Sequence, residues 1–119
     1  MAVETLTLTE FLLARLAEDE TSARDLAADA MVGAPWKHFP KDAYDEIRDM
    51  ALILAHRMKV DARVKRRIVE RCQMEIVPPG ESLSIYDAEA YTDAMASNVL
   101  EFLALPYADH EDYNPDWRP

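Results

Sequence analysis

The residues best suited to chemistry lie near the C-terminus, where His110 is flanked by Asp109, Glu111 and Asp112. An imidazole among carboxylates is the donor set of many metal sites and acid–base pairs. Successive residues cannot all point at one ion, however, and the other two histidines stand alone in the sequence. We therefore expect no catalytic residue, no metal site and no cofactor. A metal-dependent activity at Asp109, His110 and Asp112 is the weakest alternative.

The same tail mixes these polar residues with aromatic ones, although most chain ends fray. Tyr107, Tyr113 and Trp117 suit packing against a surface, while the neighbouring carboxylates pair with basic groups or stay solvated. We predict that the tail is an interaction segment, either docked on its own chain or presented to another molecule. Its predicted interaction residues are Tyr107, Asp109, His110, Asp112, Tyr113 and Trp117.

The basic residues are concentrated in one window, from Arg57 to Arg71. This window holds seven of the thirteen Lys and Arg residues against two acids, so it carries +5. The rest of the chain carries −15, which leaves the net charge of −10. Such an acidic body repels phosphate at long range, so nonspecific nucleic-acid binding is disfavoured and partners with basic surfaces are favoured.

The basic window suggests two hypotheses. In the first, the acidic tail docks on this helix within the chain and neutralises it. In the second, the helix over residues 59–71 binds nucleic acid. A recognition helix places its basic side chains on one face, whereas here they spread around most of the helix, so this reading is the weaker one. The interaction residues predicted on this helix are Arg63, Arg66, Arg67 and Arg71.

The elements that must position these groups are helices. A first helix is predicted over about Thr9–Met31, with Thr7 and Glu10 forming a capping box at its start. Gly33 and Pro35 provide its stop signals. The prediction rests on apolar residues at three- and four-residue steps, namely Phe11, Leu12, Leu16, Ala23, Leu26, Ala27 and Ala30.

A second helix is predicted to begin at Asp42, with a break near Val60 and a third helix capped by Asp61. One continuous rod also fits this stretch, because neither glycine nor proline lies between Lys41 and Val77. The apolar positions expected to face inward are Tyr44, Ile47, Met50, Ala51, Leu54, Met58, Val64, Ile68 and Cys72.

A fourth helix is predicted to begin at Ser84 or Asp87, after a turn over residues 77–80, and to end before Pro106. No stretch alternates apolar and polar residues convincingly. The sequence thus predicts an all-α fold of about four helices in a small bundle, one domain over residues 1–119, with residues 106–119 as a tail. The expected inward stripe of the last helix is Ala88, Tyr91, Met95, Val99, Phe102 and Leu103.

Composition bounds the class of protein. A chain of 119 residues is long enough to bury one core. The single cysteine, Cys72, excludes an internal disulfide, fits a reducing cytoplasm and is expected to be a small core residue. The N-terminus does not have the pattern of a signal peptide, and no apolar run approaches the roughly 18 residues of a membrane span. We expect a cytoplasmic protein that does not enter a membrane.

Four blocks occur in order along the sequence, namely FLLARLAEDE (11–20), GAPW (33–36), KRRIVE (65–70) and LALPYADHEDYNPDWRP (103–119). Together they resemble a family of small actinobacterial and actinophage proteins that is classed as a domain of unknown function. Members of that family typically carry FLRARLDEDE, a GPW loop, AKRRIVE in a helix and LLALPYADHPDYREEWRP at the end.

The chain departs from the family pattern between the GAPW loop and the basic helix. Many members carry a short glycine-containing stretch there, whereas this chain has the helical pattern PKDAYDEIRDMALILAHRM (40–58). The all-α prediction therefore does not come from the family. The resemblance implies an origin in an actinobacterium or its phage, and it implies no activity.

Taken together, the sequence favours a non-enzymatic, acidic accessory protein that acts by protein–protein interaction. The expected partner is a bacterial host protein or a second copy of the chain, as a homodimer. A nucleic-acid-associated regulator that uses the helix 59–71 is the main alternative.

Overall fold

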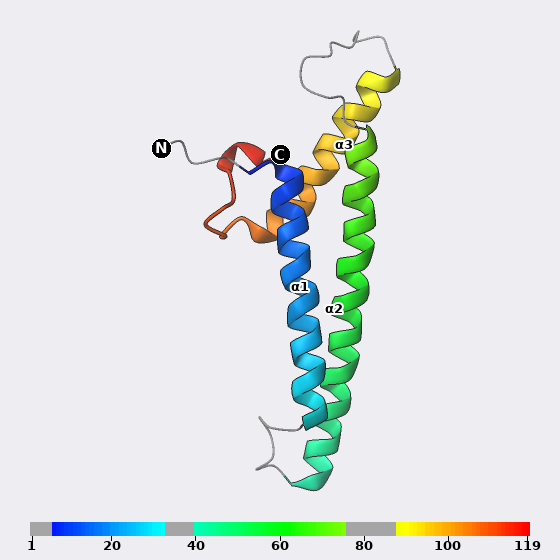
Figure 1. Cartoon of the computed structure of the whole chain (residues 1–119), viewed down its shortest axis with the longest axis vertical. Helices are drawn as coiled ribbons and strands as arrows, with labels where there is room; N and C mark the ends of the chain where they lie inside the picture. Colours follow the sequence, from blue (N-terminus) through cyan, green and yellow to red (C-terminus); the bar gives the residue numbers. More distant parts are fainter. Residues whose placement is uncertain (1–5, 33–39, 76–87) are drawn as a thin grey trace. The chain divides into compact units, whose positions relative to one another are not determined.

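The computed structural model describes residues 6–32, 40–75 and 88–119. These ranges contain three α-helices, so the predicted number of about four is wrong, and they contain no strand, so the all-α prediction is confirmed. The elements in chain order are α1 (Leu8–Val32), α2 (Lys41–Glu75), α3 (Ala88–Ala104) and two 3-10 turns, η2 (Leu105–Tyr107) and η3 (Pro115–Trp117) (Figure 1).

Helix α1 begins where the sequence predicts it, because its first turn is capped by side chains. The Glu10 N–H donates to the Thr7 Oγ1 atom at 3.1 Å, and the Thr7 N–H donates to the Glu10 Oε1 atom at 3.3 Å. This reciprocal pair satisfies two N–H groups that have no partner within the helix, so the predicted capping box is confirmed. The predicted stop signals, Gly33 and Pro35, lie outside the described residues.

Helix α2 is one continuous element of 35 residues, and the break predicted near Val60 does not occur. The helix continues because each residue from Lys41 onward can donate a backbone hydrogen bond and none is a glycine or proline. Asp61 lies inside the helix instead of capping a new one. At the start, the Tyr44 N–H donates to the Pro40 carbonyl oxygen at 2.8 Å, so the helix begins directly after a proline.

Helix α3 turns a different face inward from the predicted one. Ala96, Leu100 and Ala104 are 0–6% exposed, whereas Met95 and Phe102 are more than 60% exposed. The small alanines allow close packing on that face, and the larger side chains lie outside. The start predicted at Ser84 or Asp87 and the turn over residues 77–80 lie outside the described residues.

The chain divides into two compact units, which we call the tail unit (residues 1–15 and 65–119) and the hairpin unit (residues 16–64). The tail unit buries large side chains, with Phe11, Leu12, Val69 and Leu100 at 0–1% exposure. Cys72 is buried there too, as expected for a small core residue. Since both long helices run through the two units, the single-domain assignment stays a prediction.

In the hairpin unit, α1 and α2 lie side by side in opposite directions (Figure 1). The buried side chains are mostly alanines. Of the larger apolar residues predicted to face inward on α2 in this unit, Tyr44, Ile47 and Met58 are half-buried and three others are exposed. Met50, Leu54 and Val64 are 70%, 53% and 52% exposed. Small side chains allow two helices to approach closely, so alanines occupy the contact. Among the described residues of the hairpin unit, the buried ones are Leu16, Ala23, Ala30, Ala55 and Ala62.

None of the described helices combines the length and the apolar character needed to cross a lipid bilayer.

Candidate functional site

The C-terminal tail folds into a compact structure of short turns after α3. The Tyr113 N–H donates to the His110 carbonyl oxygen at 3.0 Å, which closes the turn between η2 and η3. Asn114 caps η3, because its Oδ1 atom accepts from the Asp116 N–H at 3.0 Å. Pro115 stands at the start of η3, a position where no N–H donor is needed. The tail is therefore locally ordered by its own sequence.

An aromatic cluster attaches this tail to the first turns of α1. The Phe11 side chain is fully buried, and the rings of four tail residues lie around it. Their centroid distances to Phe11 are 5.1 Å for Trp117, 5.7 Å for His110, 5.9 Å for Tyr113 and 6.3 Å for Tyr107. Three of these contacts are edge-to-face, the arrangement that the charge distribution of aromatic rings favours. The predicted aromatic residues therefore pack on their own chain.

Arg15, one helical turn after Phe11, adds a polar contact to this cluster. Arg15 is 7% exposed, and its guanidinium carbon lies 5.3 Å from the centre of the Phe11 ring. One guanidinium nitrogen donates to the His110 Nδ1 atom at 2.7 Å and also lies against Nε2. The same nitrogen is 3.9 Å from Asp112 Oδ2. Arg15 thus links two of the tail's polar residues to α1.

The surroundings of His110 limit the chemistry that it can perform. Its Nδ1 atom accepts from the Asp112 N–H at 3.0 Å as well as from Arg15, so donors already occupy that lone pair. A permanent guanidinium charge beside the ring opposes a metal cation at the same place. Among the described residues, no three His, Cys, Asp or Glu side chains converge as metal ligands would. The arrangement is that of an anchor for the tail.

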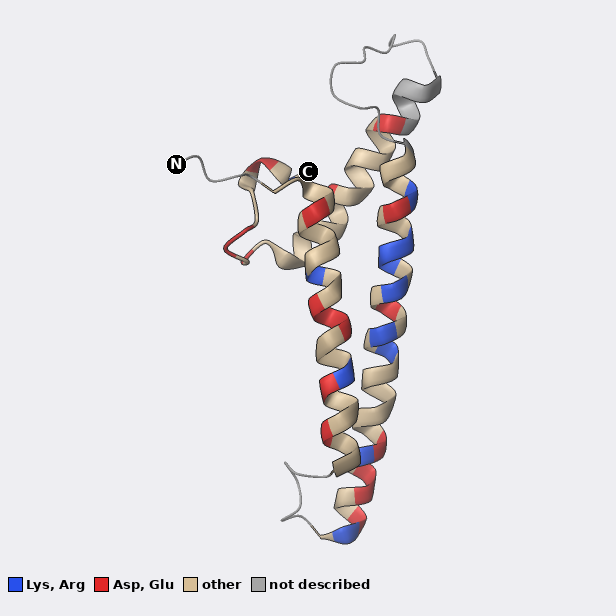
Figure 2. Ribbon diagram, in the orientation of Figure 1, with Lys and Arg blue, Asp and Glu red and all other residues tan. Residues whose placement is uncertain are grey.

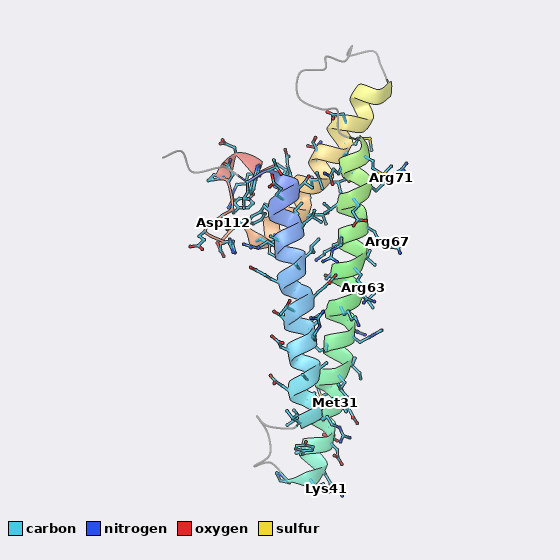
Figure 3. The ribbon with its side chains drawn as sticks, in the orientation of Figure 1. Met31, Lys41, Arg63, Arg67, Arg71 and Asp112 are labelled. Carbon is cyan, nitrogen blue, oxygen red and sulfur yellow. The ribbon has the colours of Figure 1, made fainter. Side chains whose placement is uncertain are left out.

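The hypothesis that the tail docks on the basic helix stays a prediction. One ion pair of the tail joins Asp112 to Arg15 of α1, and Asp109 is exposed. Arg63, Arg67 and Arg71 follow one another along α2 (Figure 3) and are exposed, and Arg66 is half-buried.

Sequence reasoning missed Arg15, which contacts the tail beside Phe11. One signal was present, since Arg15 follows Phe11 by four residues and therefore lies on the same apolar face of the helix. An arginine on such a face needs a partner, and the only acidic and aromatic segment without a helical pattern was the tail. A search for apolar periodicity does not detect such an arginine, because it counts apolar residues alone.

Comparison with known proteins places the chain in a family through nearly its whole length. A family model described as "Family of unknown function (DUF6221)" matches residues 5–119. The chain belongs to this family. Searches of curated proteins and of solved structures each gave no significant match. The matched range of the DUF6221 chain includes Phe11, Arg15 and the whole tail.

A cleft of about 320 Å³ lies between α1 and α2 in the hairpin unit of this DUF6221 protein. Alanines form much of its wall, and several basic side chains and one carboxylate stand around it. The residues that line it are Glu20, Ala23, Arg24, Ala27, Leu52, Ala55, His56, Lys59 and Arg63. The preponderance of basic groups makes this cleft electropositive within an acidic protein.

A second surface of the hairpin unit is apolar. On α2, five large side chains between 45% and 70% exposed recur at intervals that keep them on one side of the helix. Ala55 and Ala62, at 4% and 2% exposure, face α1 from the other side. We call this surface the α2 stripe, and its members are Met50, Ile53, Leu54, Val60 and Val64.

Proposed function

We propose that this DUF6221 protein is a non-enzymatic accessory protein that acts by protein–protein interaction. The observation that carries the proposal is the α2 stripe. Single exposed apolar side chains are ordinary on protein surfaces, but a contiguous apolar face on one helix is typical of an interaction site. The stripe spans positions 50–64, about 21 Å of helix at 1.5 Å per residue, which is long enough to contact a partner helix.

The tail has a supporting role in this proposal. Because its aromatic rings pack around Phe11, they help to hold α1 and the tail together and are less available as a free docking peptide. Its carboxylates Asp109 and Glu111 are exposed. They belong to the acidic surface that favours a partner with basic character.

The proposed setting is the cytoplasm of an actinobacterium, with the protein encoded by the bacterium or by its phage. This rests on the resemblance of the four sequence blocks and on the single cysteine. The partner would be a host protein or a second copy of the chain.

A capture experiment tests the proposed function. The tagged full-length protein is exposed to an actinobacterial lysate, once untreated and once treated with nuclease, next to the double variant Leu54→Glu/Val60→Glu. Both positions are exposed, so the variant keeps the fold while placing charges on the stripe. Met95→Glu, at an exposed apolar position of α3, is the matched control.

The expected result is one reproducible protein partner, or an untagged copy of the chain itself, recovered with the wild type and with Met95→Glu but lost with the stripe variant. Recovery of nothing but nucleic acid before nuclease treatment, and of no protein after it, would overturn the proposal.

One observation favours a second candidate function, a nucleic-acid-associated regulator. Lys59, Arg63, Arg67 and Arg71 are all exposed and follow one another at four-residue steps, so they form a row along α2. Such a row over about 18 Å could follow successive phosphates. The net charge of −10 opposes it. A salt titration of duplex DNA binding distinguishes the two, since phosphate binding gives a steep loss of affinity with salt.

A further inference from the structure

The α2 stripe has the spacing of a helix-pairing seam. Its positions 50, 53, 60 and 64, with Arg57 between them, alternate steps of three and four residues, which is the pattern of two helices that pack side by side. Arg57 does not interrupt the seam, because the aliphatic part of an arginine covers apolar surface while its charge stays in water. All of these residues lie within the hairpin unit. The surface is therefore suited to one more helix.

The charges on α2 indicate which helix fits. Residues 41–49 carry four acids and two bases, a net charge of −2, whereas residues 61–69 carry one acid and four bases, a net charge of +3. The two stretches flank the stripe on the same helix (Figure 2). A second α2 in the antiparallel direction would bring each acidic end against a basic end. A parallel α2 would bring like charges together.

We propose that the partner is a second copy of this chain, with its α2 antiparallel to the first about a two-fold axis at the level of Ala55. The inference rests on the proposed function, protein–protein interaction, and names its partner. The contact is isologous, so each pairing occurs twice. The two copies of Leu54 meet at the axis, and Met50 lies against Val60 of the partner subunit. Asp49 lies near Arg63 of the partner subunit.

The overall charge does not prevent this pairing. Two copies of a chain with net charge −10 repel at long range, but the Debye length at physiological ionic strength is only about 8 Å. Charges that face each other across the contact therefore dominate. Within each copy, Arg48 holds Asp45 at 3.6 Å and Asp49 at 3.4 Å, but these are exposed contacts of the kind that contributes little and exchanges readily.

Analytical ultracentrifugation of the full-length protein tests self-association. A contact of one helix per partner lies at the small end of specific interfaces, so the experiment covers concentrations up to about 300 µM. We expect a reversible species of twice the 13.6 kDa chain mass. Leu54→Glu/Val60→Glu raises the dissociation constant at least about 100-fold, because four carboxylates then lie in the apolar seam. Met95→Glu leaves it unchanged.

A charge swap tests the register. Asp49→Arg places the new arginine near Arg63 of the partner subunit, and by symmetry this repulsion occurs twice in the dimer. The association therefore weakens by about three- to tenfold. Adding Arg63→Asp to the same chain restores the opposite charges and with them the affinity. Arg63→Asp alone weakens the dimer as Asp49→Arg does. Restoration in the double variant distinguishes a paired contact from two independent surface effects.

Distances between spin labels test the direction. In a Cys72→Ala background, a label at His56→Cys lies about 3 Å along the axis from its mate, and a label at Asp42→Cys lies about 39 Å away. Both positions are exposed and lie on the same flank of α2. The measured distance therefore lengthens by more than about 15 Å from position 56 to position 42. A parallel pair gives equal distances at the two positions.

The proposal holds if the chain dimerises, the stripe variant dissociates and the label distance lengthens. It is overturned by a chain that stays monomeric at about 300 µM, by a dimer that survives Leu54→Glu/Val60→Glu, or by equal distances at the two label positions. These failures concern only the identity of the partner. The capture experiment reports independently on whether the stripe binds another protein, so failure of the proposed function is seen separately.

Discussion

Replacing Phe11 by alanine removes the side chain around which the tail packs. The ring is fully buried, and four tail rings have their centroids within 6.3 Å of it. Buried Phe→Ala substitutions cost about 3–5 kcal/mol, partly through lost burial and partly through the cavity that remains. Each aromatic pair adds about 0.5–1.5 kcal/mol, so the upper part of that range is expected here. For a chain of this length the melting temperature should fall by about 10–20 °C.

The assay has a global and a local readout. Thermal unfolding followed by circular dichroism gives the loss of stability. In a Trp36→Phe background, Trp117 is the single remaining tryptophan and reports on the tail itself. Because Trp117 lies 5.1 Å from Phe11, its emission should shift to longer wavelength when the cluster is lost.

Phe102→Ala is the matched control, since that ring is 61% exposed and should cost no more than about 0.5 kcal/mol. If Phe11→Ala cost less than about 1 kcal/mol, or as little as Phe102→Ala, with unchanged Trp117 emission, Phe11 would not be the residue that holds the tail.

Three further substitutions probe the caps and contacts of the tail unit. Arg15→Ala should raise chymotryptic cleavage of the tail by about 5- to 100-fold, because the lost hydrogen bond to His110 is worth about 1–3 kcal/mol; a wild-type rate would contradict the anchor. Tyr113→Phe should leave the melting temperature equal or higher, since the buried Tyr113 hydroxyl has no hydrogen-bond partner among the described residues. A clear decrease in the melting temperature would show that the hydroxyl does make a stabilising hydrogen bond. Thr7→Ala should cost about 0.5–2 kcal/mol in thermal unfolding while Thr7→Ser retains stability, and equal losses would disprove the cap.

Local features of this chain could be predicted from the sequence. The capping box of Thr7 and Glu10 and the extent of α1 depend on residues within a few positions of each other, so their pattern is complete in the sequence. The predicted break near Val60 is wrong because a capping residue alone does not end a helix. Asp61 is able to cap a helix, but no glycine or proline interrupts α2 before it, so the helix continues.

The inward faces were harder to predict because periodicity gives most weight to large apolar residues. In the hairpin unit the contact is made by alanines, and Met50, Leu54 and Val64 are left outside. Which of two apolar faces is buried depends on how closely the helices approach, and that is a property of the folded chain. The contacts of Arg15 also depend on the folded chain, because its partners His110 and Asp112 lie about 95 residues away in the sequence.

The α2 stripe is proposed above as a protein-binding surface whose partner is a second copy of the chain. The most direct test is the solution mass of the full-length protein as its concentration is raised, measured for the wild type and for Leu54→Glu/Val60→Glu. We expect the wild type to pass reversibly from 13.6 kDa to twice that mass while the variant stays at 13.6 kDa. Equal masses for the two proteins at every concentration would contradict it.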